Sequence, residues 1–80
     1  MLKIKDENFY HLCYNMVEEM NNEFGTDCEF GYVTKEGTVM WRVIDARGEI
    51  AFQSLYSDLI INFLWRTTLT LRRLMSYMPT

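Results

Sequence analysis

The 80-residue sequence predicts a two-layer α+β domain whose elements follow the order α-β-β-β-α. Three observations lead to this fold: an apolar helical period near each end of the chain, three short β-rich segments between them, and two similar polar links that each end in glycine. A typical domain has about 150 residues, so residues 1–80 should form one small domain with one core. We expect a three-stranded antiparallel meander with both helices packed on one face.

The first helix is predicted over residues 7–24, where apolar side chains recur at helical spacing. Asp6 is placed to cap its start, and Gly25 is placed to end it. Residues 1–5 leave open a short additional edge strand. The stripe expected to face the core consists of Phe9, Leu12, Cys13, Met16, Val17, Met20 and Phe24.

Three strands are predicted over residues 27–34, 38–45 and 49–53, which are rich in β-branched and aromatic side chains. The links Lys35–Gly37 and Ala46–Gly48 are both short and polar, and both end in glycine. This pattern suits a type I turn closed by a glycine in the left-handed region. Two such tight turns predict consecutive antiparallel strands.

The second helix is predicted over residues 57–77, with Ser54 or Ser57 as its cap. Residues 67–71 also alternate like a strand, but no glycine or proline interrupts the helical spacing there, so the helix is preferred. The side chains expected to face the core are Tyr56, Ile60, Phe63, Leu64, Thr67, Leu71, Leu74 and Met78.

Several chemistries find no support in the sequence, so we expect a non-enzymatic protein without metal or cofactor. The four glycines are isolated, which excludes a phosphate loop or a dinucleotide fingerprint. His11 and Cys13 lie about 200° apart on a helix, so they do not form a joint metal site or a catalytic pair. The adjacent Glu18 and Glu19 fit a solvated pair better than an acid–base pair.

Cys13 and Cys28 stand in apolar surroundings and are expected to be reduced core residues. The chain shows no secretory signal sequence and no apolar run near the ~20 residues that span a bilayer. The sequence therefore predicts a cytoplasmic protein with no membrane partner.

Charge is distributed unevenly along the chain. Residues 1–40 hold eight acids and three bases, whereas residues 41–80 hold three acids and five arginines. One acidic cluster is a candidate for docking a basic protein surface; the alternatives are a solvated face or pairing with this chain's own arginines. Its members are Glu18, Glu19, Glu23, Asp27 and Glu29.

A second candidate face lies on the outer side of the second helix. Trp and Arg are enriched at interface hot spots, and an exposed Trp beside aliphatic residues suggests a contact with a partner. A homodimer is the simplest such contact, and packing of Trp65 under a neighbouring segment is the alternative. The residues of this face are Ile61, Trp65, Arg66, Leu69, Arg72 and Arg73.

The element order resembles that of the double-stranded-RNA-binding domain, whose second helix begins with a lysine-rich segment that grips phosphates. The corresponding Ser54–Asp58 has no lysine and one acid, so that function does not carry over. In size, element order and acidity the chain is also similar to small phage-encoded inhibitors of CRISPR nucleases. This resemblance implies an inhibitor or regulator that binds and occludes another protein; the alternative is a dimer that contacts nucleic acid through the arginines of the second helix.

Overall fold

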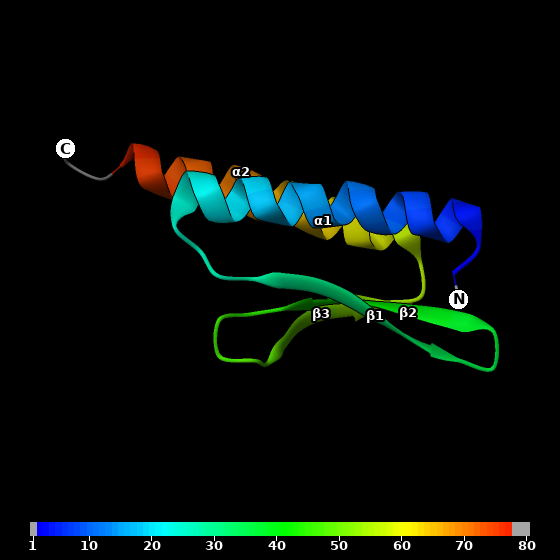
Figure 1. Ribbon diagram of the computed structural model, residues 1–80. Helices are drawn as coiled ribbons and strands as arrows, with labels where there is room; N and C mark the ends of the chain where they lie inside the picture. Colours follow the sequence, from blue (N-terminus) through cyan, green and yellow to red (C-terminus); the bar gives the residue numbers. More distant parts are fainter. Residues whose placement is uncertain (1, 78–80) are drawn as a thin grey trace.

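The computed structural model describes residues 2–77 and confirms the predicted element order (Figure 1). Both helices lie side by side on one face of the sheet and run in the same direction, so the order α-β-β-β-α forms two layers. The elements are α1 (Ile4–Phe24), β1 (Glu29–Lys35), β2 (Thr38–Ile44), β3 (Ile50–Ser54) and α2 (Ser57–Ser76).

The sheet is an antiparallel meander in the order β1-β2-β3, as predicted. Tyr32 pairs with Trp41 across β1 and β2, and Val43 pairs with Phe52 across β2 and β3. Helix α1 packs over β1 and α2 packs over β3, so each helix lies beside an edge strand. Among residues 2–77 no element covers the opposite sheet face, where Arg42 Nε donates to Gln53 Oε1 at 3.1 Å.

The β1–β2 turn differs from the prediction. Lys35 pairs with Thr38, so the loop has only two residues, Glu36 and Gly37, with φ angles of 53° and 77°. Two consecutive positive φ angles define a type I′ turn, which matches the twist of the strands better than type I. The prediction of type I was wrong because glutamate rarely adopts a positive φ, and sequence preference alone does not anticipate it.

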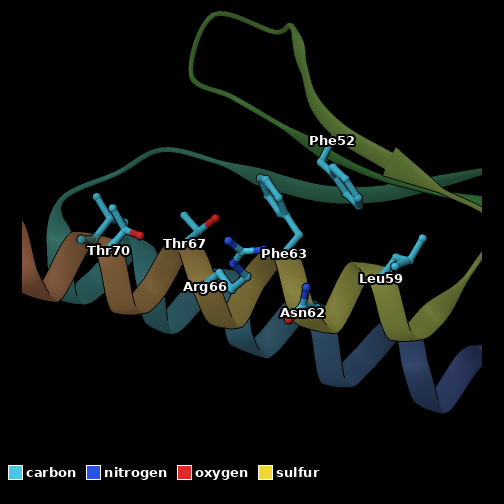
Figure 2. Close-up of a pocket in the computed structure, with 8 residues that line it drawn as sticks. Phe52, Leu59, Asn62, Phe63, Arg66, Thr67 and Thr70 are labelled. Carbon is cyan, nitrogen blue, oxygen red and sulfur yellow. The ribbon is translucent and has the colours of Figure 1, made fainter.

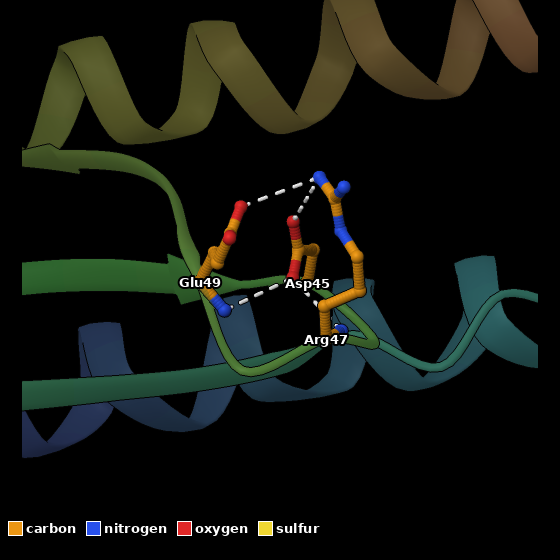
Figure 3. Close-up of polar contacts among 3 residues, drawn as sticks. All are labelled: Asp45, Arg47 and Glu49. Carbon is orange, nitrogen blue, oxygen red and sulfur yellow. Dashed lines mark hydrogen bonds and ion pairs between the residues drawn. The ribbon is translucent and has the colours of Figure 1, made fainter.

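The β2–β3 turn is the type I turn closed by a left-handed glycine that the sequence predicts. Gly48 has a φ of 84° and donates its backbone N–H to the Asp45 carbonyl at 3.0 Å. The Asp45 carboxylate accepts backbone hydrogen bonds from Glu49 at 3.0 Å and Arg47 at 2.9 Å (Figure 3). The Arg47 guanidinium lies 3.4 Å from the carboxylate of Asp45 and 3.4 Å from that of Glu49. Chiefly through the Glu49 N–H bond, this arrangement lowers the pKa of Asp45.

The core lies between the helices and the sheet. It confirms most of the predicted stripe of α1 but not Leu12, which is 53% exposed. Because α2 lies beside α1 rather than above it, only a narrow strip of each helix is enclosed. The buried apolar residues are Cys13, Val17, Met20, Phe30, Trp41, Val43, Ile60 and Leu64.

The start of α1 also differs from the prediction. The helix begins at Ile4 after Lys3, whose carbonyl accepts the Glu7 N–H at 2.8 Å. Asp6 is therefore not the cap but lies in the first turn, where a carboxylate favours the helix dipole. The possible edge strand over residues 1–5 is wrong for Ile4 and Lys5, which are helical, and Met1 lies outside the described residues. Gly25 ends the helix as predicted, with a φ of 69°.

Helix α2 is continuous through residues 67–71, so the alternative strand there is wrong. Ser54 precedes the helix and accepts the Tyr56 N–H at 3.0 Å, but neither Ser54 nor Ser57 is the N-cap residue. Tyr56 and Leu74, predicted to face the core, are 64% and 55% exposed because they lie at the ends of α2, beyond the enclosed part of the core. Met78 lies outside the described residues.

Candidate protein-binding surfaces

The five acids of the predicted cluster do not form one surface, because α1 separates them. Consecutive helical residues point about 100° apart, so Glu18 and Glu19 lie on different sides of α1. Glu18 joins Asp27 and Glu29 around a hollow of about 370 Å³ between α1 and β1. Glu23 instead faces α2.

Glu23 forms an ion pair with Arg72 of α2. The Arg72 Nε and Nη2 atoms lie 3.0 and 3.2 Å from the two carboxylate oxygens of Glu23. The hydrogen bond from Arg72 lowers the pKa of Glu23 and raises that of Arg72, and the nearby charge of Glu19 raises the pKa of Arg72 further. Glu23 therefore follows the alternative of pairing with the chain's own arginine.

Asn21 fixes the loop that presents the other acids. Its side-chain oxygen accepts the Cys28 N–H at 3.0 Å and the Thr26 hydroxyl at 2.8 Å, and its Nδ2 donates to the Cys28 carbonyl at 2.9 Å. Asp27 and Glu29 flank the clamped residue, so their backbone positions are set by these bonds. Asn21 was not predicted as a functional residue; its position four residues after the core-facing Val17, which sets it apart from the exposed Asn22, is the sequence signal that could have identified it.

Tyrosines surround the same hollow. Tyr10 and Tyr14 line it beside Glu18, and the spacing of these three residues at i, i+4 and i+8 is a sequence signal that could have identified them. The ring of Tyr10 lies 6.0 Å from that of Tyr14 and 5.5 Å from that of Tyr32 on β1. Tyr14 and Tyr32 remain 43% and 41% exposed. We call the surface formed by Tyr10, Tyr14, Glu18, Asp27 and Glu29 the acidic flank.

The two cysteines are free thiols, as predicted; Cys13 is buried and Cys28 half-buried. Burial raises the pKa of Cys13 to about 12. Burial, together with the charges of Asp45 and Asp27, also raises the pKa of Cys28. A thiol with a raised pKa is a poor nucleophile and a poor metal ligand at neutral pH. Within residues 2–77 no group of three or more His, Cys, Asp or Glu side chains could hold a metal ion.

The residues of the predicted outer face of α2 do not form one surface but lie in three different surroundings. Trp65 and Leu69 are 56% and 44% exposed, and Trp65 lines a shallow groove of about 530 Å³ between the two helices together with Leu12 and the half-buried Ile61. Arg72 is held by Glu23. Arg66 lies on the other side of α2, facing away from α1.

That other side of α2 forms a second flank, beside β3. Phe52 of β3 and Phe63 of α2 stack there with ring centroids 4.6 Å apart and planes within 5° of parallel. Figure 2 shows these rings together with Leu59, Arg66, Thr67 and Thr70. We call the surface formed by Phe52, Leu59, Phe63, Arg66 and Leu71 the apolar flank.

The chain matches no protein-family model, no curated protein and no solved structure among those compared with it. In the part of the chain that the structure describes, neither helix combines the length and apolar character needed to cross a bilayer.

Proposed function

We propose that this chain is a non-enzymatic protein that binds a basic surface of another protein through its acidic flank and inhibits or regulates that protein by covering it. The observation that carries this proposal is the gathering of Glu18, Asp27 and Glu29 around one hollow. Within residues 2–77 none of these three acids takes part in an ion pair. Their charge is therefore available to a partner. The free thiols of Cys13 and Cys28 fit a cytoplasmic setting.

The tyrosines of the acidic flank supply aromatic contact area for a partner, which the carboxylates do not. Electrostatic complementarity mainly raises association rates and selects partners, whereas buried aromatic area contributes more of the affinity. Tyr14 lines the hollow together with the acids and is 43% exposed. Because Asn21 already holds the loop around Asp27, little further ordering is needed when a partner binds.

The first test uses a capped eight-residue peptide with three arginines as a probe, titrated at low salt and followed by backbone amide shifts. We expect the shifts to centre on Glu18, Asp27 and Glu29. The variant Glu18→Lys should weaken binding about tenfold, because it removes one attractive charge and adds a repulsive one. Glu36→Lys, at the tip of the β1–β2 turn, changes the net charge equally and serves as the matched control.

Three results would contradict the proposal: equal weakening by both variants, shifts spread over the whole surface, or equal binding of a peptide with glutamates in place of arginines. The first two would mean that the probe senses only net charge. Once a natural partner is known, its association rate should show the same contrast between Glu18→Lys and Glu36→Lys.

The nucleic-acid alternative receives less support from the geometry. Arg72 already binds Glu23, so α2 offers only Arg66 and Arg73 to phosphates. Phosphate contacts would give binding that weakens steeply with salt for any sequence, which a salt titration with a mixed-sequence duplex can detect.

Self-association through the groove between the helices is a further proposal that the exposure of Trp65 supports. Trp65→Glu should then convert a dimer to a monomer in sedimentation while the helical signal persists. A wild-type chain that is monomeric at high micromolar concentration would exclude this contact.

A further inference from the structure

The apolar flank forms a groove with an unusual combination of neighbours: stacked aromatic rings, an open strand edge and one arginine. Its volume is about 570 Å³, and most of the lining comes from the side of α2 that faces away from α1. The stack of Phe52 on Phe63 closes its inner wall (Figure 2). Leu59 and Leu71 extend the apolar lining along the helix.

Strand β3 borders this groove and is an edge strand. It pairs with β2 on one side, and within residues 2–77 no strand lies on its other side. An exposed edge can accept a further strand through its backbone N–H and C=O groups, while a neighbouring groove takes alternate side chains of the added strand. The five residues Ile50–Ser54 span about 17 Å, enough to pair with a short extended segment.

Arg66 gives the groove its charge preference. It lines the groove, and within residues 2–77 no ion pair includes it. Arg73 lies two turns further along the same side of α2, since seven residues return to within about 20° of the starting direction. The acid closest in sequence to β3, Glu49, is already bound to Arg47 (Figure 3). The flank therefore complements a negatively charged segment.

The spacing of Phe63 and Arg66 on α2 determines which positions of the bound segment face the aromatic stack and the arginine. Phe63 and Arg66 are about 4.5 Å apart along the helix axis, and alternate side chains of a strand are about 6.7 Å apart. The flexible Arg66 side chain can bridge this difference. An apolar side chain against the aromatic stack thus brings a carboxylate two positions away within reach of Arg66.

From this juxtaposition we propose that β3 and α2 form a second docking site, which binds an extended peptide segment of a partner protein by strand addition. The segment places an apolar side chain against Phe52 and Phe63, and a carboxylate two residues away against Arg66. This site lies on the opposite flank from the acidic one and selects the opposite charge, so it is independent of the function proposed above.

The test uses a capped eight-residue peptide with a leucine and an aspartate two positions apart in a serine–threonine background. Titration followed by amide shifts should show changes along β3 and at Arg66. Arg66→Gln should raise the dissociation constant about three- to tenfold, as expected for a partly exposed charge-assisted hydrogen bond. Lys35→Gln removes the same charge at the end of β1, on the opposite edge of the sheet, and should leave binding unchanged.

Two altered peptides separate the parts of the proposal. Replacing the aspartate by lysine should abolish measurable binding. N-methylation of alternate backbone nitrogens should also abolish binding when the methylated nitrogens are those whose N–H groups bond to β3. Each alternate set of nitrogens is methylated in turn, so that one of the two peptides must fail. The peptide comparison decides the question even if Arg66→Gln does not fold.

The proposal is overturned if the lysine peptide binds equally well, if both methylated peptides bind unchanged, or if Arg66→Gln and Lys35→Gln behave alike. Shifts confined to the acidic flank would also overturn it. If the chain alone self-associates in sedimentation and Arg66→Gln prevents this, the occupant is a second copy rather than a partner segment, and the proposal fails in that form.

Discussion

The two flanks of this molecule are built from the same parts and present opposite chemistry. In each, a helix lies beside an edge strand of one sheet, α1 over β1 and α2 over β3. The acidic flank carries three carboxylates and two tyrosines, whereas the apolar flank carries a phenylalanine stack and an arginine. The backbone arrangement is therefore alike at both edges, and the side chains alone make the two flanks chemically different.

The flanks also differ in how firmly they are supported. Beneath the acidic flank, Trp41 lies at the centre of an aromatic cluster, with its ring 4.9 Å from Phe9 and 5.8 Å from Phe30. The apolar flank rests on the single stack of Phe52 and Phe63, both half-buried. We therefore expect the acidic flank to be the more rigid of the two.

The largest expected effect comes from removing these supports. Trp41→Ala should lower the free energy of unfolding by about 3–5 kcal/mol, because Trp41 is only 3% exposed and occupies the central strand. Phe63→Ala should cost about half as much, since its ring is partly solvated in the folded chain. Urea denaturation at low temperature measures both. Equal losses would show that the two flanks are equally supported.

A smaller effect should follow from removing the clamp of the acidic flank. Asn21→Ala deletes three hydrogen bonds to the loop at Thr26 and Cys28, so the free energy of unfolding should fall by about 1–3 kcal/mol. The Cys28 amide should exchange faster with solvent. Asn22→Ala, at the neighbouring exposed position, should change neither quantity, and a comparable loss there would point to helix propensity instead.

The smallest effect concerns the ion pair that joins the ends of the helices. The pKa of Glu23 is lowered from its ordinary value of 4.5, so its contribution to stability is present above pH 4.5 and is lost as the pH falls through the lower folded-state pKa. The urea midpoints of the wild type and Glu23→Gln should differ slightly at pH 6 and converge as the pH falls below the folded-state pKa of Glu23. A difference that persists at low pH, or that salt does not reduce, would contradict this origin.

Much of the fold could be predicted because local patterns determine it. The apolar period places Val17 and Ile60 in the core, and Gly25 and Gly48 mark a helix end and a turn through their positive φ angles. The predictions that failed are those in which the burial of a residue depends on the position of a neighbouring element. Leu12 has the spacing of a core residue, yet it is exposed because α2 lies beside α1 instead of covering it.

The candidate surfaces were less predictable for the same reason. Sequence proximity groups Glu18 with Glu23, but the side of the helix on which each lies separates them. Arg72 is 49 residues from Glu23, and no local pattern announces their contact. Asn21 acts through backbone groups of a loop whose shape depends on the packing of β1. The sequence could indicate which side chains are available for binding but not which of them the chain itself already uses.

Because the two cysteines are unequally buried, their rates of reaction with a thiol reagent report two different opening motions of the chain. Cys13 is 0% exposed at the centre of the core, whereas Cys28 is half-buried beside the loop that Asn21 holds. A thiol reagent should therefore modify Cys28 through local fluctuations and Cys13 only when the helices separate from the sheet. Since alkylation leaves a distinct mass at each site, one time course reports both motions in the unmutated chain.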